Sequence, residues 1–187
     1  MATRSIENKM VLWLDNKLAN NGLAQNAIKN KDARTLFRLA AECCVGIKET
    51  SNNSGPMVEL IQETIGSAVK ESWCMSFIMT CLAYAEVKTG IKSSVFPSEL
   101  CTEVWNKTPK FLRVKKIPAP GAITVWQRGS TIYGHTGVML EWQDNKFISC
   151  EGNTSDLSVS NGDCVAVKSR SSKATGALKV LGWLKPF

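Results

Sequence analysis

The sequence predicts an α+β domain of papain-like type, in which N-terminal helices pack on a C-terminal antiparallel β-sheet. Three observations indicate this class. In the first half, apolar residues recur at helical spacing. From Ile117 onward, short apolar runs alternate with turn residues, as in β-hairpins. All helical patterns precede all strand patterns, an order typical of α+β proteins. The chain has 187 residues, 44% of them hydrophobic, which is enough to bury a core and excludes a disordered or collagen-like chain.

The first part of the chain, residues 6–46, is predicted to be helical. A first helix has an apolar stripe made by Met10, Val11, Leu14 and Leu18, and Asn20-Asn21-Gly22 stops it. A second helix is expected from Asp32 to Val45, with Gly46 at the position that favours glycine after a helix. A third helix is expected to open at Pro56, after a polar loop, and to end at Gly66.

The segment 72–85 is apolar almost all round, which predicts a buried central helix. Ser72 is the expected N-cap, because a serine hydroxyl can accept from the free N–H groups of the first turn. Gly90 follows the expected end of this helix. A further short helix is expected around Pro97 to Trp105.

The C-terminal part carries five predicted strands. They cover Ala122–Trp126, His135–Trp142, Lys146–Cys150, Cys164–Ser169 and Leu178–Leu184. Gln143-Asp144-Asn145 is expected to form the hairpin turn between the second and third of them.

The protein is basic, with 23 Lys and Arg against 16 Asp and Glu, a formal charge of +7. Such a charge favours polyanionic surroundings, among them nucleic acid, anionic lipid and an anionic cell wall. The densest basic segment, Lys107 to Lys116, is interrupted by apolar residues, and we interpret it as a solvated face. Because the sequence has neither a basic run nor an aromatic-basic platform, nucleic acid is not an expected partner.

The seven cysteines are odd in number, and none of them forms a CxxC pair. This pattern predicts neither a disulfide framework nor a structural zinc site, and free thiols are typical of a reducing compartment. Asp15 and Lys17 interrupt the single candidate for the apolar part of a signal peptide, and no apolar segment reaches membrane-spanning length. We therefore expect synthesis in the cytoplasm without a signal peptide or a transmembrane segment.

Cys74 is the first candidate for chemistry, because it lies in the first turn of the predicted buried helix. The free N–H groups and the positive end of the helix dipole at that place stabilise a thiolate and can donate to an oxyanion. The alternative is a buried structural cysteine, which is common in apolar helices. That is our interpretation of the other six cysteines: Cys43, Cys44, Cys81, Cys101, Cys150 and Cys164.

A nucleophilic cysteine needs a base, and the base needs a group that orients it. His135 is the single histidine, at the start of a predicted strand, where Gly134 and Gly137 leave space near the imidazole. Glu151 and Asn153 follow the next predicted strand; since residues two apart on a strand project to one face, both can reach one site. Taken singly, each of these residues is more typical of ordinary structure.

Together the motifs resemble the CHAP domain, the cysteine- and histidine-dependent amidohydrolase/peptidase module of the papain-like group. The matching segments, in chain order, are Ser72-Trp73-Cys74-Met75-Ser76-Phe77, Pro120-Gly121-Ala122-Ile123-Thr124-Val125-Trp126, Gly134-His135-Thr136-Gly137-Val138, Glu151-Gly152-Asn153-Thr154 and Gly182-Trp183-Leu184-Lys185-Pro186. The resemblance covers residues 36–187. It suggests a domain at 35–187 preceded by an N-terminal helical extension at 1–34, whose role we interpret as a brace.

The resemblance implies an enzyme that cleaves amide bonds of bacterial peptidoglycan. Cys74 would be the nucleophile, His135 the general base and acid, Glu151 the residue that orients His135, and Asn153 an assistant. Trp73 and Tyr133 are the candidates for substrate binding, whereas Trp126 and Trp142 are expected to pack in the core. The chain departs from the family at Ala122, where an acidic residue is usual. The segment before Cys74 carries one carboxylate, Glu71, so no metal is expected there, and no cofactor is expected elsewhere.

Small stand-alone enzymes of this family often serve as phage endolysins, which implies a monomer that acts at the cell wall and, in a phage, needs a holin for release. Two alternatives stay open: an effector of a bacterial secretion system with the same chemistry, and a non-catalytic wall-binding domain. The sequence does not distinguish an N-acetylmuramoyl-L-alanine amidase from a peptidoglycan endopeptidase.

Overall fold

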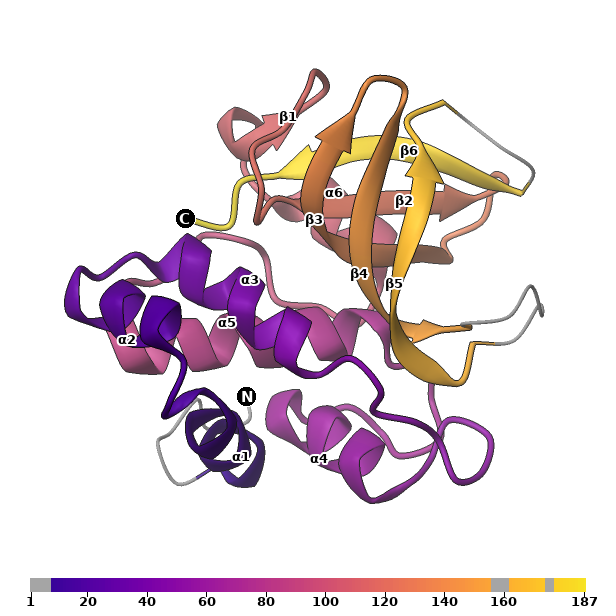
Figure 1. Ribbon diagram of the computed structural model, residues 1–187. Helices are drawn as coiled ribbons and strands as arrows, with labels where there is room; N and C mark the ends of the chain where they lie inside the picture. Colours follow the sequence, from indigo (N-terminus) through magenta and orange to yellow (C-terminus); the bar gives the residue numbers. More distant parts are fainter. Residues whose placement is uncertain (1–7, 156–161, 174–176) are drawn as a thin grey trace.

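The computed structural model describes residues 8–155, 162–173 and 177–187 and has the predicted α+β architecture (Figure 1). The helices of this part are α1 (Lys9–Leu18), α2 (Gly22–Lys29), α3 (Ala33–Cys43), α4 (Pro56–Ile65), α5 (Cys74–Thr89), α6 (Cys101–Lys107) and the 3₁₀ turn η1 (Lys110–Leu112). The strands are β1 (Arg113–Val114), β2 (Ile123–Arg128), β3 (Gly134–Gln143), β4 (Lys146–Thr154), β5 (Cys164–Ser171) and β6 (Leu178–Leu184). They form one antiparallel sheet in the order β1-β6-β2-β3-β4-β5, which confirms the predicted papain-like class.

The N-terminal segment holds three helices where two were singled out. Asn20-Asn21-Gly22 ends α1 as expected, but it also starts α2, because the Asn21 side chain accepts a hydrogen bond from the backbone N–H of Ala24 at 3.0 Å. An asparagine that stops one helix can thus cap the next. Pro56 begins α4 and Gly66 ends it in the left-handed conformation, as predicted.

Helix α5 runs through the middle of the molecule and is buried along most of its length (Figure 1). It packs against α3 and α4 and against strands β3 and β4. Gly90 ends it with φ +74°, as predicted. The expected N-cap is wrong: Trp73 occupies that position, without a capping hydrogen bond from its side chain, so Cys74 is the first residue of the helix.

The sheet contains all five predicted strands and one more, the two-residue strand β1. The predicted hairpin between β3 and β4 is confirmed, with Gln143 paired to Lys146 and Asp144 in the left-handed conformation. Register shifts interrupt the pairing of β3 with β4 after Met139 and of β4 with β5 after Glu151. The second shift changes which way the residues after Glu151 face.

Two apolar clusters cover the two faces of the sheet. The larger one joins the helices to the sheet through buried residues such as Phe77 of α5 and Val138 of β3, and α1 contributes Met10, Leu14 and others to it. Thus the helices before residue 35 pack into the same core as the rest of the chain, while the domain boundary after residue 34 stays a prediction. The smaller cluster, on the opposite face, comprises Ala122, Trp126, Met139, Phe147 and Trp183.

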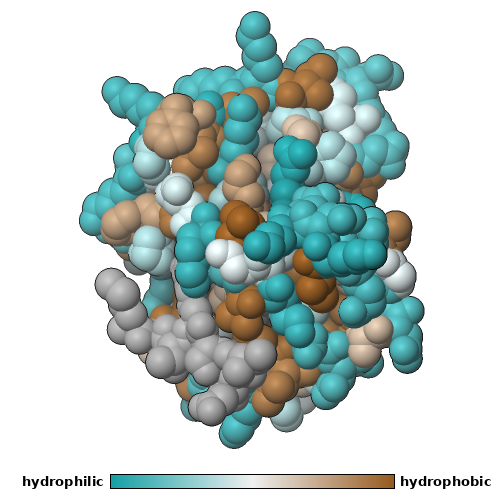
Figure 2. All heavy atoms as spheres, turned by 90° about the vertical axis from the view of Figure 1, so that its left-hand side faces the viewer, coloured by the Kyte–Doolittle hydropathy of each residue, from teal (hydrophilic) through white to brown (hydrophobic). Residues whose placement is uncertain are grey.

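The outer surface in Figure 2 carries hydrophobic side chains in separate patches among hydrophilic ones. Within the described residues, no helix combines the length and the apolar character needed to cross a membrane.

Candidate active site

Cys74 occupies the N-terminal end of α5, and its side chain is almost completely buried. As the first helical residue it lies among the backbone N–H groups that have no partner inside the helix. The N–H of Met75 is one of these, and it contacts the Cys74 sulfur. The thiol therefore lies at the positive end of the helix, where a negative charge is stabilised.

His135 begins the buried part of β3 and joins two of the predicted site residues. Its Nε2 lies 2.8 Å from Glu151 Oε2, and its ring lies close enough to Cys74 for each side chain to shift the pKa of the other. Because Glu151 occupies Nε2, Nδ1 is the nitrogen that remains for the sulfur. Cys74, His135 and Glu151 thus form a continuous chain of contacts that runs from α5 across β3 to β4.

Arg170 of β5 extends this chain on the far side of Glu151. Its Nε donates to Glu151 Oε1 at 2.8 Å and its Nη2 donates to Glu151 Oε2, so the carboxylate is held by both oxygens. The guanidinium also lies 5.7 Å from the centre of the Trp126 ring, and Trp126 stacks on His135 with centroids 5.6 Å apart. Arg170 and Trp126 therefore restrict how Glu151 and His135 can move.

Cys101 places a second thiol next to that of Cys74. It is the first residue of α6 and is buried, and its sulfur lies 3.8 Å from that of Cys74. At this distance either sulfur can donate its proton to the other. The interpretation of Cys101 as a packing residue is therefore incomplete.

The electrostatics of the site favour an ion pair. The Cys101 thiol has the strongest effect on Cys74 and lowers its pKa; His135 acts in the same direction, against the effect of burial. Burial favours neutral His135, but its contacts with Cys74 and Glu151 outweigh burial and raise its pKa to about 9. At neutral pH these directions give a Cys74 thiolate beside a His135 imidazolium.

Glu151 is ionised in this arrangement although it is fully buried. Burial raises the pKa of a carboxyl, but the hydrogen bonds from Arg170 and His135 outweigh it and bring the pKa of Glu151 down to about 2. Its negative charge thus lies between two positive side chains, which offsets the cost of burying it.

Glycines make room for the side chains of the candidate site, as expected, but protein atoms fill the space. A Cβ on Gly137 would lie 2.6 Å from Cγ of Glu151, so this glycine lets the carboxylate cross β3 to His135. A Cβ on Gly134 would overlap the carbonyl oxygen of Trp126 and approach Cys101.

Asn153 belongs to a different group of residues from the one predicted. Its Nδ2 donates to Asn53 Oδ1 at 2.7 Å and to Glu49 Oε1 at 3.4 Å. The assumption that Asn153 shares a face with Glu151 is wrong, because Asn153 has φ +51° and the register of β4 shifts at this point. Its role as a catalytic assistant stays a prediction.

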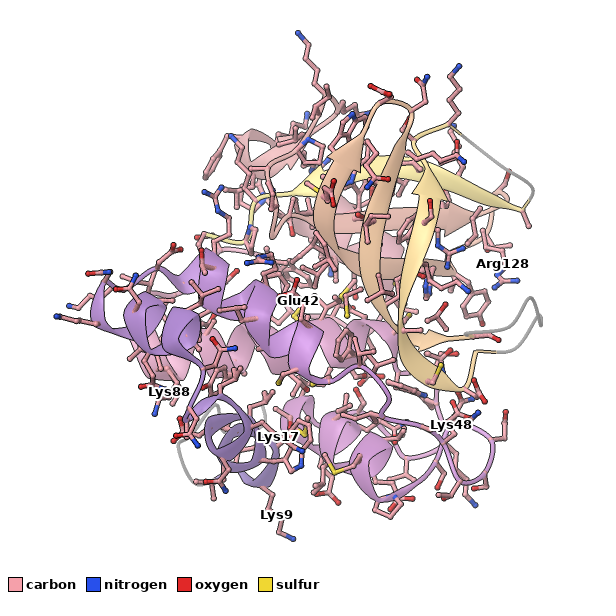
Figure 3. The ribbon with its side chains drawn as sticks, viewed as in Figure 1. Lys9, Lys17, Glu42, Lys48, Lys88 and Arg128 are labelled. Carbon is pink, nitrogen blue, oxygen red and sulfur yellow. The ribbon has the colours of Figure 1, made fainter. Side chains whose placement is uncertain are left out.

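Trp73 and Tyr133, the predicted substrate-binding residues, lie in opposite environments. Trp73 is fully buried and its indole N–H donates to Glu49 Oε1 at 2.8 Å, so it has no surface free for substrate and holds the start of α5 instead. Tyr133 is 61% exposed in the β2–β3 turn. The backbone N–H of Arg128, labelled in Figure 3, donates to the Tyr133 carbonyl and closes that turn.

Three residues of the site were missed: Cys101, Arg170 and Glu49. Each is distant in sequence from the residue that it supports, and none belongs to a local motif. A cavity of about 920 Å³ is lined by residues of α4, α5 and the segment 93–100, which directly precedes Cys101 in the chain.

Comparison with known proteins agrees with this geometry. No curated protein matches the chain. Residues 66–153 match the family model of the CHAP domain, a span that begins just before α5 and includes Cys74, His135 and Glu151. CHAP domains are cysteine- and histidine-dependent amidohydrolases or peptidases, so the match indicates a hydrolase of amide bonds. Residues 66–153 of the chain are therefore similar to a CHAP domain.

Proposed function

We propose that the protein hydrolyses an amide bond of bacterial peptidoglycan, with Cys74 as nucleophile, His135 as general acid and base, and Glu151 as the residue that orients His135. The observation that carries this proposal is the arrangement of His135 between Cys74 and Glu151, with 2.8 Å between His135 Nε2 and Glu151 Oε2 and with the Cys74 thiol close enough to raise the pKa of His135. A buried thiol, imidazole and carboxylate in this order fulfil the three roles of a cysteine hydrolase.

The reaction begins at the sulfur. The Cys74 thiolate attacks the carbonyl carbon of the amide, and the C–S bond forms as the carbonyl oxygen becomes an oxyanion. Backbone N–H groups at the start of α5, that of Cys74 among them, are suited to donate to this oxyanion. They are fixed by the helix before substrate arrives.

His135 then moves the protons. The imidazolium gives its Nδ1 proton to the leaving amine nitrogen as the C–N bond breaks, which leaves a thioester on Cys74. Neutral His135 next removes a proton from water, the resulting hydroxide attacks the thioester, and Cys74 leaves as thiolate. Throughout, Glu151 accepts from Nε2 and Arg170 keeps Glu151 ionised.

The peptidoglycan substrate rests on the CHAP match and on the charge of the protein. A formal charge of +7 favours binding near anionic wall polymers. The proposal covers two reactions, that of an N-acetylmuramoyl-L-alanine amidase and that of a peptidoglycan endopeptidase, because one catalytic group serves both.

The biological role that we propose is that of an endolysin. The protein would be made in the cytoplasm, act as a monomer at the cell wall and depend on a holin for release. A secretion-system effector would have the same site, and the two roles differ in their neighbouring genes: a holin for an endolysin, an immunity protein for an effector.

The test of the catalytic proposal is digestion of purified peptidoglycan, with mass spectrometry of the products. Wild type should release fragments, and Cys74→Ala should lower the rate by about a thousandfold or more, because the nucleophile is gone. The matched control is Cys81→Ala, which removes a buried thiol from the same helix. New ends at the lactyl group of muramic acid identify an amidase, and new peptide ends identify an endopeptidase. Equal digestion by wild type and Cys74→Ala would overturn the assignment.

A further inference from the structure

We propose that Cys74 and Cys101 form a redox-sensitive pair, in which a peroxide converts the two thiols into a disulfide that blocks the nucleophile. Its effect on hydrolysis rests on the proposed function, but its chemistry can be tested without substrate. The starting observation is the sulfur–sulfur distance of 3.8 Å between the first residue of α5 and the first residue of α6.

The two sulfurs need only a small movement to form a disulfide bond. A disulfide has a sulfur–sulfur distance of about 2.05 Å, so the two sulfurs must approach by roughly 1.8 Å, a change that side-chain rotation at the two helix ends can supply. Gly134 contributes to this arrangement, because a Cβ there would lie 3.1 Å from Cys101 Cβ. The glycine thus allows Cys101 to sit beside β3, close to the nucleophile.

The chemistry of the two thiols differs in the way that such a reaction requires. Cys74, beside His135 and at a helix N-terminus, is the thiolate and hence the sulfur that reacts with oxidants. Cys101 keeps its proton and acts second, because its contact with Cys74, and then burial, raise its pKa. Within the described part of the chain, Cys101 is the cysteine whose sulfur contacts that of the predicted nucleophile.

The reaction balances with one peroxide. The Cys74 thiolate attacks a peroxide oxygen, the O–O bond breaks, and hydroxide leaves, so that Cys74 becomes a sulfenic acid. Cys101 loses its proton to that hydroxide and attacks the Cys74 sulfur. The S–S bond forms, and the hydroxyl group of the sulfenic acid departs as hydroxide and takes up the proton that the His135 imidazolium had received from Cys74. In sum, two thiols and one hydrogen peroxide give one disulfide and two water molecules. A small dithiol reductant reverses the bond by exchange.

The disulfide has a direct consequence for the active site. It removes the thiolate that attacks substrate and the anionic partner of His135 at once. A protein with this pair is active while its thiols are reduced and is protected from irreversible over-oxidation of Cys74.

The experiment treats the full chain with hydrogen peroxide and maps its peptides without reduction. Wild type should yield one cross-linked species that contains Cys74 and Cys101, and Cys74 should lose its reaction with iodoacetamide until dithiothreitol is added. Peptidoglycan hydrolysis should fall by at least ~10-fold and recover with the same reductant.

Two variants make the test specific. In Cys101→Ser, which keeps the size of the side chain, peroxide should convert Cys74 to sulfinic or sulfonic acid, which dithiothreitol does not reverse. Cys43→Ser, which alters a half-buried thiol bonded within α3, should behave like wild type. A disulfide between other cysteines, or full recovery of Cys74 in Cys101→Ser, would overturn the proposal. If the cross-link forms but the reduced protein does not digest peptidoglycan, the redox pair stands and the proposed function fails.

Discussion

At the scale of single residues, the site depends on one proton that His135 must hold at the right moment. Its pKa of about 9 means that the imidazolium persists at neutral pH although the side chain is buried. Glu151 raises that pKa by accepting from Nε2, and Arg170 fixes Glu151 in its ionised state. The pKa of one histidine is thus set by burial, by Cys74 of α5, and by two side chains from two other strands, Glu151 directly and Arg170 through Glu151.

The pH dependence of hydrolysis follows from these directions. Activity should fall as the pH rises through about 9, because neutral His135 cannot protonate the leaving amine. In Glu151→Gln one contact that raises the pKa is lost, so this alkaline limb should move to lower pH. The measurement is the initial rate of peptidoglycan digestion from about pH 5 to about pH 10 for both proteins. An unchanged alkaline limb in Glu151→Gln would show that Glu151 does not act through His135.

Sequence patterns could predict the central residues of the site but not those that support them. Cys74, His135 and Glu151 each belong to a short motif, and their order along the chain made their meeting predictable. Cys101 and Arg170 reach the site only because α6 and β5 are placed beside it by the fold, so no local pattern marks them. Trp73 was misplaced for the opposite reason: it is next to the nucleophile in sequence, yet Glu49 holds it in the core.

At the scale of elements, glycines let the strands bring the side chains of the candidate site together. Gly137 of β3 pairs across the sheet with β2, and a Cβ there would meet Glu151 of β4 at 2.6 Å. Helix α5 supplies the other half of the site, and a Cβ on Gly152 would lie 2.7 Å from Phe77 of that helix. The close approach of α5 to the sheet therefore requires a glycine at position 152 of β4.

Gly137→Ala tests this dependence. The added methyl should push Glu151 away from His135 and lower the hydrolysis rate by at least about tenfold, because small displacements of catalytic groups are costly. Overpacking should also cost about 1–3 kcal/mol of stability, and the protein should still fold. Gly22→Ala is the control, since a Cβ at this position meets nothing within 4 Å. Rates and thermal unfolding of both variants measure the two effects; a full rate in Gly137→Ala would contradict the role of this glycine.

The prediction of elements succeeded where a pattern was long or had a clear boundary and failed where one residue served two elements. The buried run of α5 and the strand β6 are examples of success. Helix α2 was not singled out, because Asn21 signals both the end of α1 and the start of α2. Strand β1 has two residues, too few for an alternating pattern, and it exists through its pairing with β6.

At the scale of the whole molecule, the N-terminal helices share their core with the catalytic part of the chain. Met10, Leu14 and Leu18 of α1 are buried in the cluster that also holds Phe77 of α5 and Val138 of β3. The CHAP match begins at residue 66, well after these helices. A shared core predicts that the segment before residue 35 acts as a brace and unfolds together with the site.

Leu14→Ala should therefore destabilise the entire protein and not α1 alone. Loss of a fully buried leucine should lower the free energy of unfolding by about 2–5 kcal/mol. Leu12→Ala is the matched control on the same helix, because Leu12 is 46% exposed and its loss should change stability by about 0.5 kcal/mol or less. Denaturant unfolding followed by helical circular dichroism, and alkylation of the fully buried Cys81 of α5 followed over the same denaturant range, should give one shared transition with a lowered midpoint in Leu14→Ala. If Cys81 stays protected while the helical signal is lost in a separate first step, the N-terminal helices are an independent appendage and the brace is excluded.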